Sequence, residues 1–244
     1  MHNVLVTGGS RGIGLAIARR LAASGYHVIA VARRESDELK AAVAEAVKQG
    51  RGLLHFRPFD LSEIEAIPAF VKGLRDEFGA LYGLVNNAGI GTEGLLATMH
   101  NSEIEALLRL NVLSPVILTK YVVRQMMADG AGRIINMSSI IASTGYNGLS
   151  VYGATKAAAT GFTKSQAREV GKLGITVNAI APGFIDTELT QSLSDDQRKR
   201  IASRSALRRL PDTDDVARMV EYLLGDGGRN ITGSVMTIDA GNTA

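Results

Sequence analysis

Four polar residues in the middle of the sequence have the types and spacing of an acid–base catalytic site. Tyr152 and Lys156 are four residues apart in a helical pattern, so both side chains fall on one helix face and can share one site. Ser139 lies thirteen residues before the tyrosine, at the end of an expected strand, and Asn111 belongs to the preceding helical segment. A tyrosine and a lysine at this spacing are common on exposed helices, so the pair alone does not define a site.

A phenol beside an ammonium group can donate a proton to a carbonyl oxygen. A free tyrosine has a pKa of about 10, which makes it a poor acid–base catalyst near neutral pH. A lysine charge about 4 Å away contributes about 1 kcal/mol in bulk water and about 4 kcal/mol at an effective dielectric of about 20, or about three pKa units. We therefore expect a partly dry site in which Tyr152 donates the proton and Ser139 holds the carbonyl oxygen by a hydrogen bond.

A glycine-rich turn follows the first expected strand, with the sequence Thr7-Gly8-Gly9-Ser10-Arg11-Gly12-Ile13-Gly14. Glycines let the backbone approach a pyrophosphate closely, and the N–H groups of the helix that begins near Gly12 stabilise its charge. The same residues could form a tight turn that binds nothing. Their place in the first βα turn of the expected sheet favours a dinucleotide site.

The end of the second expected strand distinguishes NADP from NAD. An acidic side chain at this position pairs with a free ribose 2′-hydroxyl, whereas a cation accepts a 2′-phosphate. The sequence here is Val31-Ala32-Arg33-Arg34, which has no acid, and Arg11 of the glycine turn is expected nearby. Either arginine alone could be an ordinary solvated residue, but the missing acid and the cations together predict NADPH as the cofactor.

Short apolar runs alternate with amphipathic helical patterns along the chain, which is typical of a parallel sheet covered by helices on both faces. We expect an α/β fold: a single-domain, Rossmann-type doubly wound parallel sheet of about seven strands over residues 1–244. Residues 182–210 are too many for an ordinary connection, and a substrate lid is expected at about 183–210. The expected strands are Asn3–Thr7, His27–Val31, Leu53–Arg57, Leu81–Asn86, Arg133–Ser138, Ile175–Ala181 and Val235–Asp239, and the expected helices are 12–24, 35–49, 62–78, 101–129 with a break near Pro115, 150–172 and 212–225.

The composition argues against several classes of protein. The absence of cysteine excludes disulfides, thiolate metal sites and cysteine nucleophiles, and His2, His27, His55 and His100 lack metal-ligand spacing, so no metal is expected. No stretch of about 18 uncharged apolar residues and no signal pattern occurs, which predicts a cytoplasmic protein with no membrane partner. The net charge is +3 and basic residues are interleaved with acidic ones, which does not favour nucleic-acid binding.

These motifs together resemble the short-chain dehydrogenase/reductase family. Thr7, Gly8, Gly12 and Gly14 match its T-G-x-x-x-G-x-G pattern, and N-N-A-G and Y-x-x-x-K follow in the family's order with Ser139 and Asn111. The resemblance implies hydride transfer from a nicotinamide, a second role for Lys156 in binding the nicotinamide ribose, and a water chain positioned by Asn111. The cofactor site expected from the residues and the resemblance comprises Thr7, Gly8, Ser10, Arg11, Gly12, Ile13, Gly14, Arg33, Arg34, Asp60, Leu61, Asn87, Ala88, Gly89, Tyr152, Lys156, Pro182, Gly183, Ile185 and Thr187.

Within this family the chain resembles the bacterial 3-oxoacyl-[acyl-carrier-protein] reductases from Val4 to Asp239, which implies a carrier-bound acyl substrate, a role in fatty acid biosynthesis and a homotetramer. It departs from them where they commonly carry basic docking residues, because Ala128-Asp129-Gly130-Ala131 precedes the fifth strand and Leu173 stands beside Lys172. A reductase of 3-oxoacyl-CoA, a sugar, a steroid or a small ketone therefore stays open. An NADPH-binding regulator and a nucleic-acid-binding protein are alternatives from other classes, against which the complete set of four polar residues and the interleaved charges argue.

Overall fold

A seven-stranded sheet forms the centre of the computed structural model, which describes residues 1–185 and 195–244. Its strand order is β3-β2-β1-β4-β5-β6-β7, and every neighbouring pair is parallel. The order reverses direction between β1 and β4, so the predicted doubly wound Rossmann-type sheet is confirmed. The strands are β1 Asn3–Thr7, β2 His27–Ala32, β3 Leu53–Pro58, β4 Leu81–Asn86, β5 Gly132–Met137, β6 Ile175–Pro182 and β7 Val235–Ile238.

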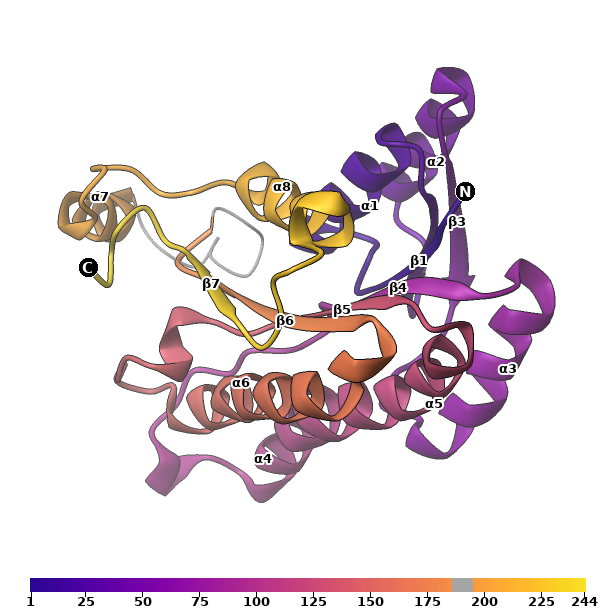
Figure 1. Cartoon of the computed structure of the whole chain (residues 1–244). Coiled ribbons are helices and arrows are strands. Elements are labelled where there is room, and N and C mark those ends of the chain that lie inside the picture. Colours follow the sequence, from indigo (N-terminus) through magenta and orange to yellow (C-terminus); the bar gives the residue numbers. More distant parts are fainter. Residues whose placement is uncertain (186–194) are drawn as a thin grey trace.

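Helices cover both faces of the sheet, as Figure 1 shows, with α1, α2 and α8 on one face and α3, α5 and α6 on the other. Helix α4 packs outside this second layer against α6, and α7 lies beside the end of β7 and the C-terminus. The helices are α1 Gly12–Ala23, α2 Asp37–Gln49, α3 Ile67–Phe78, α4 Asn101–Leu108, α5 Ser114–Asp129, α6 Ser150–Val170, α7 Asp195–Arg204 and α8 Thr213–Leu224.

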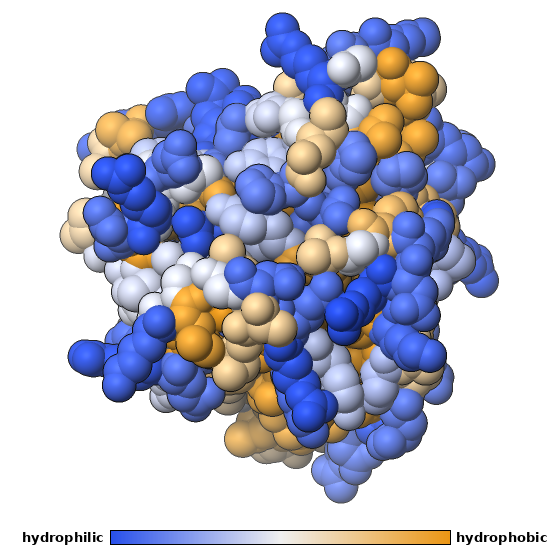
Figure 2. Space-filling model, turned by 45° about the vertical axis from the view of Figure 1, so that its right-hand side comes forward, coloured by the Kyte–Doolittle hydropathy of each residue, from blue (hydrophilic) through white to orange (hydrophobic). Residues whose placement is uncertain are grey.

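The sheet is apolar on both sides because its strands are buried between two helical layers. In β1, Val4 and Val6 point into the core formed with α1, α2 and α8, while Leu5 between them points into the core formed with α3, α5 and α6. All three side chains are fully buried. This explains why the strands read as continuous apolar runs and not as alternating ones. On the face that Figure 2 shows, hydrophobic residues occur in small separate groups among hydrophilic ones.

The long helical pattern at 101–129 contains the predicted interruption. Helix α4 continues into a π-helical turn at Arg109–Leu113, and α5 follows with Pro115 in its first turn. Pro115 has no N–H to donate to the carbonyl of Asn111, four residues before it, so the regular hydrogen-bond ladder changes there. The run Asn101–Asp129 contains an 18-residue window with a mean hydropathy of 1.4, so it is long and apolar enough to cross a membrane, and 33% of that window is buried. Packing of α5 against β4, β5 and α3 buries part of these apolar side chains.

One further boundary differs from the prediction, and one predicted segment lies partly outside the described residues. A short 3-10 turn at Ile64–Ala66 precedes α3, which begins only at Ile67 because Pro68 suits a first helical turn and not a helix interior. The lid expected at about 183–210 is described at 183–185 and again from α7 onward, and its middle lies outside the described residues.

Candidate active site

The fold brings Ser139, Tyr152 and Lys156 together at the carboxyl end of β5. Ser139 follows β5 in an extended conformation, and Tyr152 and Lys156 lie on the face of α6 that turns toward it. The Ser139 hydroxyl lies close enough to the Tyr152 phenol to lower its pKa. Lys156 Nζ donates to the Met137 carbonyl at 3.0 Å and lies 5.6 Å from the centre of the Tyr152 ring. A carbonyl oxygen bound next to Ser139 would therefore meet a hydroxyl and a phenol together.

Asn111 joins this group from the π-helical turn, and its side-chain amide forms three hydrogen bonds. Its Oδ1 accepts from Ile90 N at 2.9 Å, and its Nδ2 donates to Ile90 O at 2.8 Å and to Thr155 Oγ1 at 3.2 Å. Thr155 Oγ1 in turn donates to the Tyr152 carbonyl at 2.7 Å. Asn111 thus fastens the loop after β4 to the helix that carries Tyr152. The sequence analysis missed Thr155, because a hydroxyl residue inside a helix carries no signal of its own.

Burial shifts the pKa values of the two titratable catalytic candidates. Burial disfavours the ammonium and lowers the pKa of Lys156 to about 8. It also raises the pKa of Tyr152 by disfavouring the phenolate, and the hydrogen bond with Ser139 opposes this effect. The expected dry site is present, but the expected lowering of the Tyr152 pKa by Lys156 is not, because desolvation of the phenol is the larger effect. Tyr152 is therefore protonated at neutral pH and can act as a proton donor.

The glycine turn has the backbone shape that a pyrophosphate needs. Gly8 and Gly12 adopt φ values of 66° and 53°, which favour glycine. A Cβ on Gly14 would lie 2.1 Å from the carbonyl oxygen of Gly8, so α1 sits directly on the turn. The cap residue Arg11 gives no side-chain hydrogen bond to the first turn of α1, and that turn contains no acid. The N–H groups at this helix start therefore suit phosphate oxygens, and the site fits a dinucleotide.

Thr7 and Asn87 hold the turn in place. Thr7 Oγ1 donates to Val85 O at 3.2 Å and accepts from the N–H groups of Asn87 and Ala88 at 2.9 and 3.0 Å. Asn87 Nδ2 returns a hydrogen bond to Thr7 O at 2.9 Å. These side chains join the ends of β1 and β4 at the point where the strand order reverses, and so shape the cofactor edge.

A buried polar network behind this edge was also missed by the sequence analysis. Asn86 Nδ2 donates to Asn136 Oδ1 at 2.8 Å and to Thr119 Oγ1 at 2.9 Å, and Asn136 Nδ2 donates to Thr163 Oγ1 at 2.9 Å. The network links β4 and β5 to α5 and α6. Asparagine in an otherwise apolar strand was the available signal, since a buried amide requires partners.

The loop after β2 is tied to the glycine turn at the position expected for a 2′-phosphate. Gly9 N donates to Val31 O at 3.2 Å, and Ser36 Oγ donates to Ser10 O at 2.6 Å. Arg33 and Arg34 lie in the loop after β2, and Arg11 lies in the glycine turn. All three are exposed. The three expected cations therefore belong to the two segments that these hydrogen bonds join.

Asp60 lies opposite this loop, after β3. Its Oδ1 accepts from Ser62 N at 2.9 Å and from Ser62 Oγ at 2.7 Å. These hydrogen bonds lower the pKa of Asp60, and the positive charge of Arg33 lowers it further. The neighbouring Leu61 is buried in the core. Asp60 is thus an ionised acceptor near Arg33, which suits a contact with the adenosine part of a dinucleotide.

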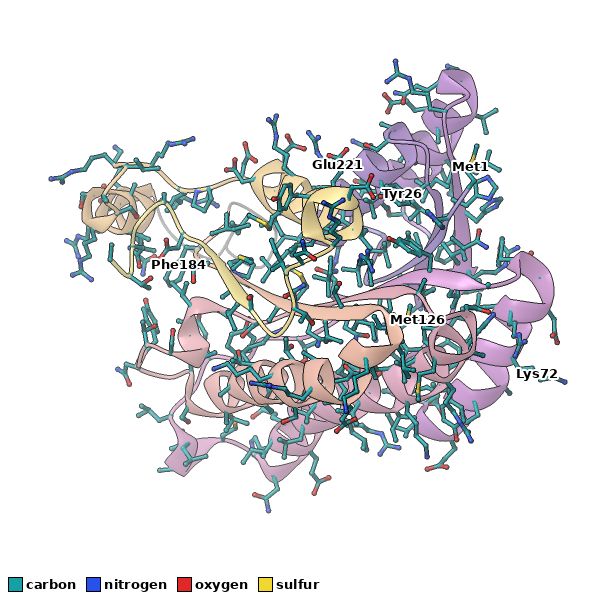
Figure 3. The ribbon with its side chains drawn as sticks, in the orientation of Figure 1. Met1, Tyr26, Lys72, Met126, Phe184 and Glu221 are labelled. Carbon is teal, nitrogen blue, oxygen red and sulfur yellow. The ribbon has the colours of Figure 1, made fainter. Side chains whose placement is uncertain are left out.

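The residues expected on the nicotinamide side of the site begin at the end of β6. Gly183 N donates to Ile238 O at 2.8 Å, and a Cβ on Gly183 would lie 2.7 Å from Asp239 Cβ, so this position has no room for a side chain. Ile185 is buried. The ring centroids of Phe184 and Tyr146 are 5.7 Å apart. Figure 3 shows Phe184 beside β7. Thr187 lies outside the described residues.

A parallel sheet with a glycine turn after its first strand, next to a buried tyrosine and lysine, defines the class of nucleotide-dependent oxidoreductases with a Rossmann-type fold. A family model described as short chain dehydrogenase matches residues 2–198, and the chain belongs to that family.

The relatives and solved structures agree with this family. The chain is 41% identical to the 3-oxoacyl-[acyl-carrier-protein] reductase FabG of Vibrio harveyi, over 97% of this chain and 95% of the relative, and 40% identical to that of Escherichia coli K12, again over 97% and 95%. A short-chain dehydrogenase from Burkholderia cenocepacia in complex with NADP is 36% identical with a TM-score of 0.91 over 100% of this chain and 98% of the other. A gluconate 5-dehydrogenase from the same organism, in complex with NADP and tartrate, is 28% identical with a TM-score of 0.93 over 99% and 95%.

Proposed function

We propose that the protein reduces the 3-carbonyl of a 3-oxoacyl-[acyl-carrier-protein] to a secondary alcohol with NADPH. The observation that carries this proposal is the arrangement of Ser139, Tyr152 and Lys156 beside the glycine turn at one edge of the sheet. The curated relatives named above are reductases of this substrate, and two structural neighbours contain NADP.

The residues fit a mechanism of proton donation to a carbonyl oxygen. When bound, NADPH supplies the hydride that the carbonyl carbon accepts. The Ser139 hydroxyl holds the carbonyl oxygen, and Tyr152 donates its phenolic proton to that oxygen as negative charge develops. Lys156, whose Nζ lies 5.6 Å from the centre of the Tyr152 ring, would hold the nicotinamide ribose beside the phenol. Asn111 keeps α6 and the loop after β4 in register through Thr155 and Ile90.

NADPH in preference to NADH follows from Arg33, with Arg34 and Arg11 beside it. An arginine can form charge-assisted hydrogen bonds with a 2′-phosphate, and Ala32 offers no carboxylate to the 2′-hydroxyl of NADH.

A substrate panel tests the proposal directly. The wild-type protein is assayed with NADPH against 3-oxoacyl thioesters, sugar acids, sugars, steroids and small ketones, and the loss of NADPH is followed. We expect the highest kcat/KM with 3-oxoacyl thioesters. A preference for a sugar acid, as in the gluconate 5-dehydrogenase relative, would reassign the substrate. Binding of NADPH without turnover of any carbonyl would favour a regulator.

A homotetramer is part of the same proposal. Helices α4 to α6 and the turns at their ends carry large apolar side chains that are exposed in the single chain, among them Leu108, Leu113, Met127 and Leu173. Pairing of these helices across one two-fold axis would bury them, and pairing of the C-terminal strand region across another would complete the tetramer. Sedimentation at micromolar concentration should give the mass of four chains, and a monomer would contradict the proposal.

A further inference from the structure

Basic residues are concentrated in one segment near the active-site edge. From Arg198 to Arg209, six of twelve residues are basic and none is acidic, which is an exception to the interleaved charges elsewhere. The chain as a whole has a net charge of only +3, so everything outside this segment is net negative. We call it the basic segment. Its cations are Arg198, Lys199, Arg200, Arg204, Arg208 and Arg209.

The fold fixes the basic segment at the substrate edge of the sheet. Leu207 N donates to Ala240 O at 3.0 Å and Ala206 N to Gly241 O at 3.2 Å, directly after β7. Asp239 at the end of β7 packs against Gly183 at the end of β6, where the nicotinamide side of the site is expected. Figure 1 shows α7 beside these strand ends. A molecule bound to the basic segment would therefore lie next to the carboxyl ends of β6 and β7.

The surface combines positive charge with an apolar side chain. Lys199, Arg200, Arg204 and Arg208 are exposed, and Leu207 among them is 60% exposed. Arg208 has a φ of 54°, uncommon for a residue other than glycine, and its Nη1 donates to Ser203 O at 2.6 Å. The hydrogen bond between Arg208 and Ser203 therefore stabilises the conformation of this turn.

We propose that the basic segment docks the acidic surface of the carrier protein that delivers the thioester. This inference rests on the proposed function. Opposite charges speed encounter and set orientation, while an exposed leucine inside the patch can pack against an apolar side chain between the partner's acids. A nucleic acid is the less favoured occupant, since the segment contains no aromatic side chain for base stacking.

The test compares a carrier-bound and a neutral form of the same acyl group. The variant carries Lys199→Glu, Arg200→Glu and Arg204→Glu, none of which belongs to the catalytic or cofactor residues. The control carries Lys48→Glu, Arg51→Glu and Lys72→Glu, with the same change in net charge at exposed positions away from α7. Figure 3 shows Lys72 at the opposite side of the molecule from Phe184. The substrates are 3-oxobutyryl-[acyl-carrier-protein], 3-oxobutyryl-CoA and the 3-oxobutyryl thioester of N-acetylcysteamine.

We expect kcat/KM for the carrier substrate to fall at least about tenfold in the α7 variant, or about 1.4 kcal/mol. With the N-acetylcysteamine thioester it should stay within about twofold of wild type, and the control should stay within about twofold on both substrates, because exposed charges act over about a Debye length. Raising salt from about 50 to 300 mM should weaken wild-type activity on the carrier substrate only.

Three results would overturn the docking site. The first is an unchanged kcat/KM of the α7 variant on the carrier substrate, the second an equal loss in the control, and the third an equal loss with the neutral thioester. If the α7 variant loses activity equally on the carrier-protein and CoA substrates but not on the N-acetylcysteamine thioester, the basic segment binds the phosphates attached to the acyl thioester and not the carrier protein. If wild type reduces neither thioester, the proposed function fails. In that case docking is tested by measuring the binding of the carrier protein, without an acyl group, to each form of the enzyme. The carrier protein should bind wild type and the control but not the α7 variant. Binding of a DNA duplex in place of the carrier would refute it.

Discussion

Replacing Lys156 by methionine should stabilise the protein without its cofactor while abolishing turnover. The side chain of Lys156 is buried, and its pKa falls from 10.5 to about 8 because the ammonium has lost its hydration. The folded state therefore binds the Lys156 proton more weakly than the unfolded chain does. Below pH 8 the full cost of burying the charge opposes folding, and this cost disappears as the pH rises toward 10.5.

The magnitude follows from the size of the shift. A difference of this size corresponds to ~3 kcal/mol at about 1.36 kcal/mol per pKa unit. The methionine variant also loses the 3.0 Å hydrogen bond from Nζ to the Met137 carbonyl, which subtracts about 1 kcal/mol. A net gain of about 2 kcal/mol should remain at pH 7, or roughly 4–8 °C in Tm for a chain of this length.

Urea unfolding of both proteins at matched concentration measures the difference in free energy of unfolding at pH 7 and about pH 9.5. The advantage of the methionine variant should shrink by about 2 kcal/mol at the higher pH, because the wild type has lost most of its buried charge. A variant that is less stable at pH 7, or a difference that does not depend on pH, would refute the reasoning. Lys164→Met is the control, because it makes the same substitution at an exposed position of the same helix. Its free energy of unfolding should not show this dependence on pH.

Three further sets of substitutions test separate parts of the site. Tyr152→Phe should abolish turnover and leave NADPH affinity nearly intact, and more than about a tenth of wild-type activity would defeat its assignment as proton donor. Ala32→Asp with Arg33→Ser should invert the preference for NADPH over NADH, which we expect to be about tenfold or more at low salt in the wild type; equal use of both by the wild type would remove the NADP assignment. Thr155→Val removes the hydroxyl that accepts a hydrogen bond from Asn111, and it should lower kcat far more than it raises KM. Thr155→Ser keeps the hydroxyl and should retain the wild-type kcat. An equal loss of kcat in the two variants would indicate that Thr155 has only a packing role.

The sheet could be predicted closely because its signals are local. Strand β1 was predicted with its observed bounds, since a run of apolar residues followed by glycines leaves little choice of conformation. The π-helical turn at Arg109–Leu113 could be located only as a break, because Pro115 removes a donor without specifying which helical form replaces the α-helix.

The candidate site was less complete in the sequence than in the structure. Tyr152 and Lys156 are recognisable by type and spacing, but the role of Thr155 depends on which residue of another helix faces it, and sequence spacing does not contain that distance. The direction of the Tyr152 pKa shift likewise depends on how deeply the phenol is buried relative to the lysine charge. Both are tertiary properties, and reasoning from charge pairs alone predicted the wrong sign.

Asn111 connects the loop after β4 to α6 in a way that does not depend on the side chains of that loop. Its two hydrogen bonds to Ile90 reach main-chain atoms, the N–H and the carbonyl, and none reaches the side chain. Nineteen of the twenty amino acids supply both groups, and only proline lacks the N–H. The side chain at position 90 can therefore change while the loop after β4 stays attached, through Asn111 and Thr155, to the helix that carries Tyr152.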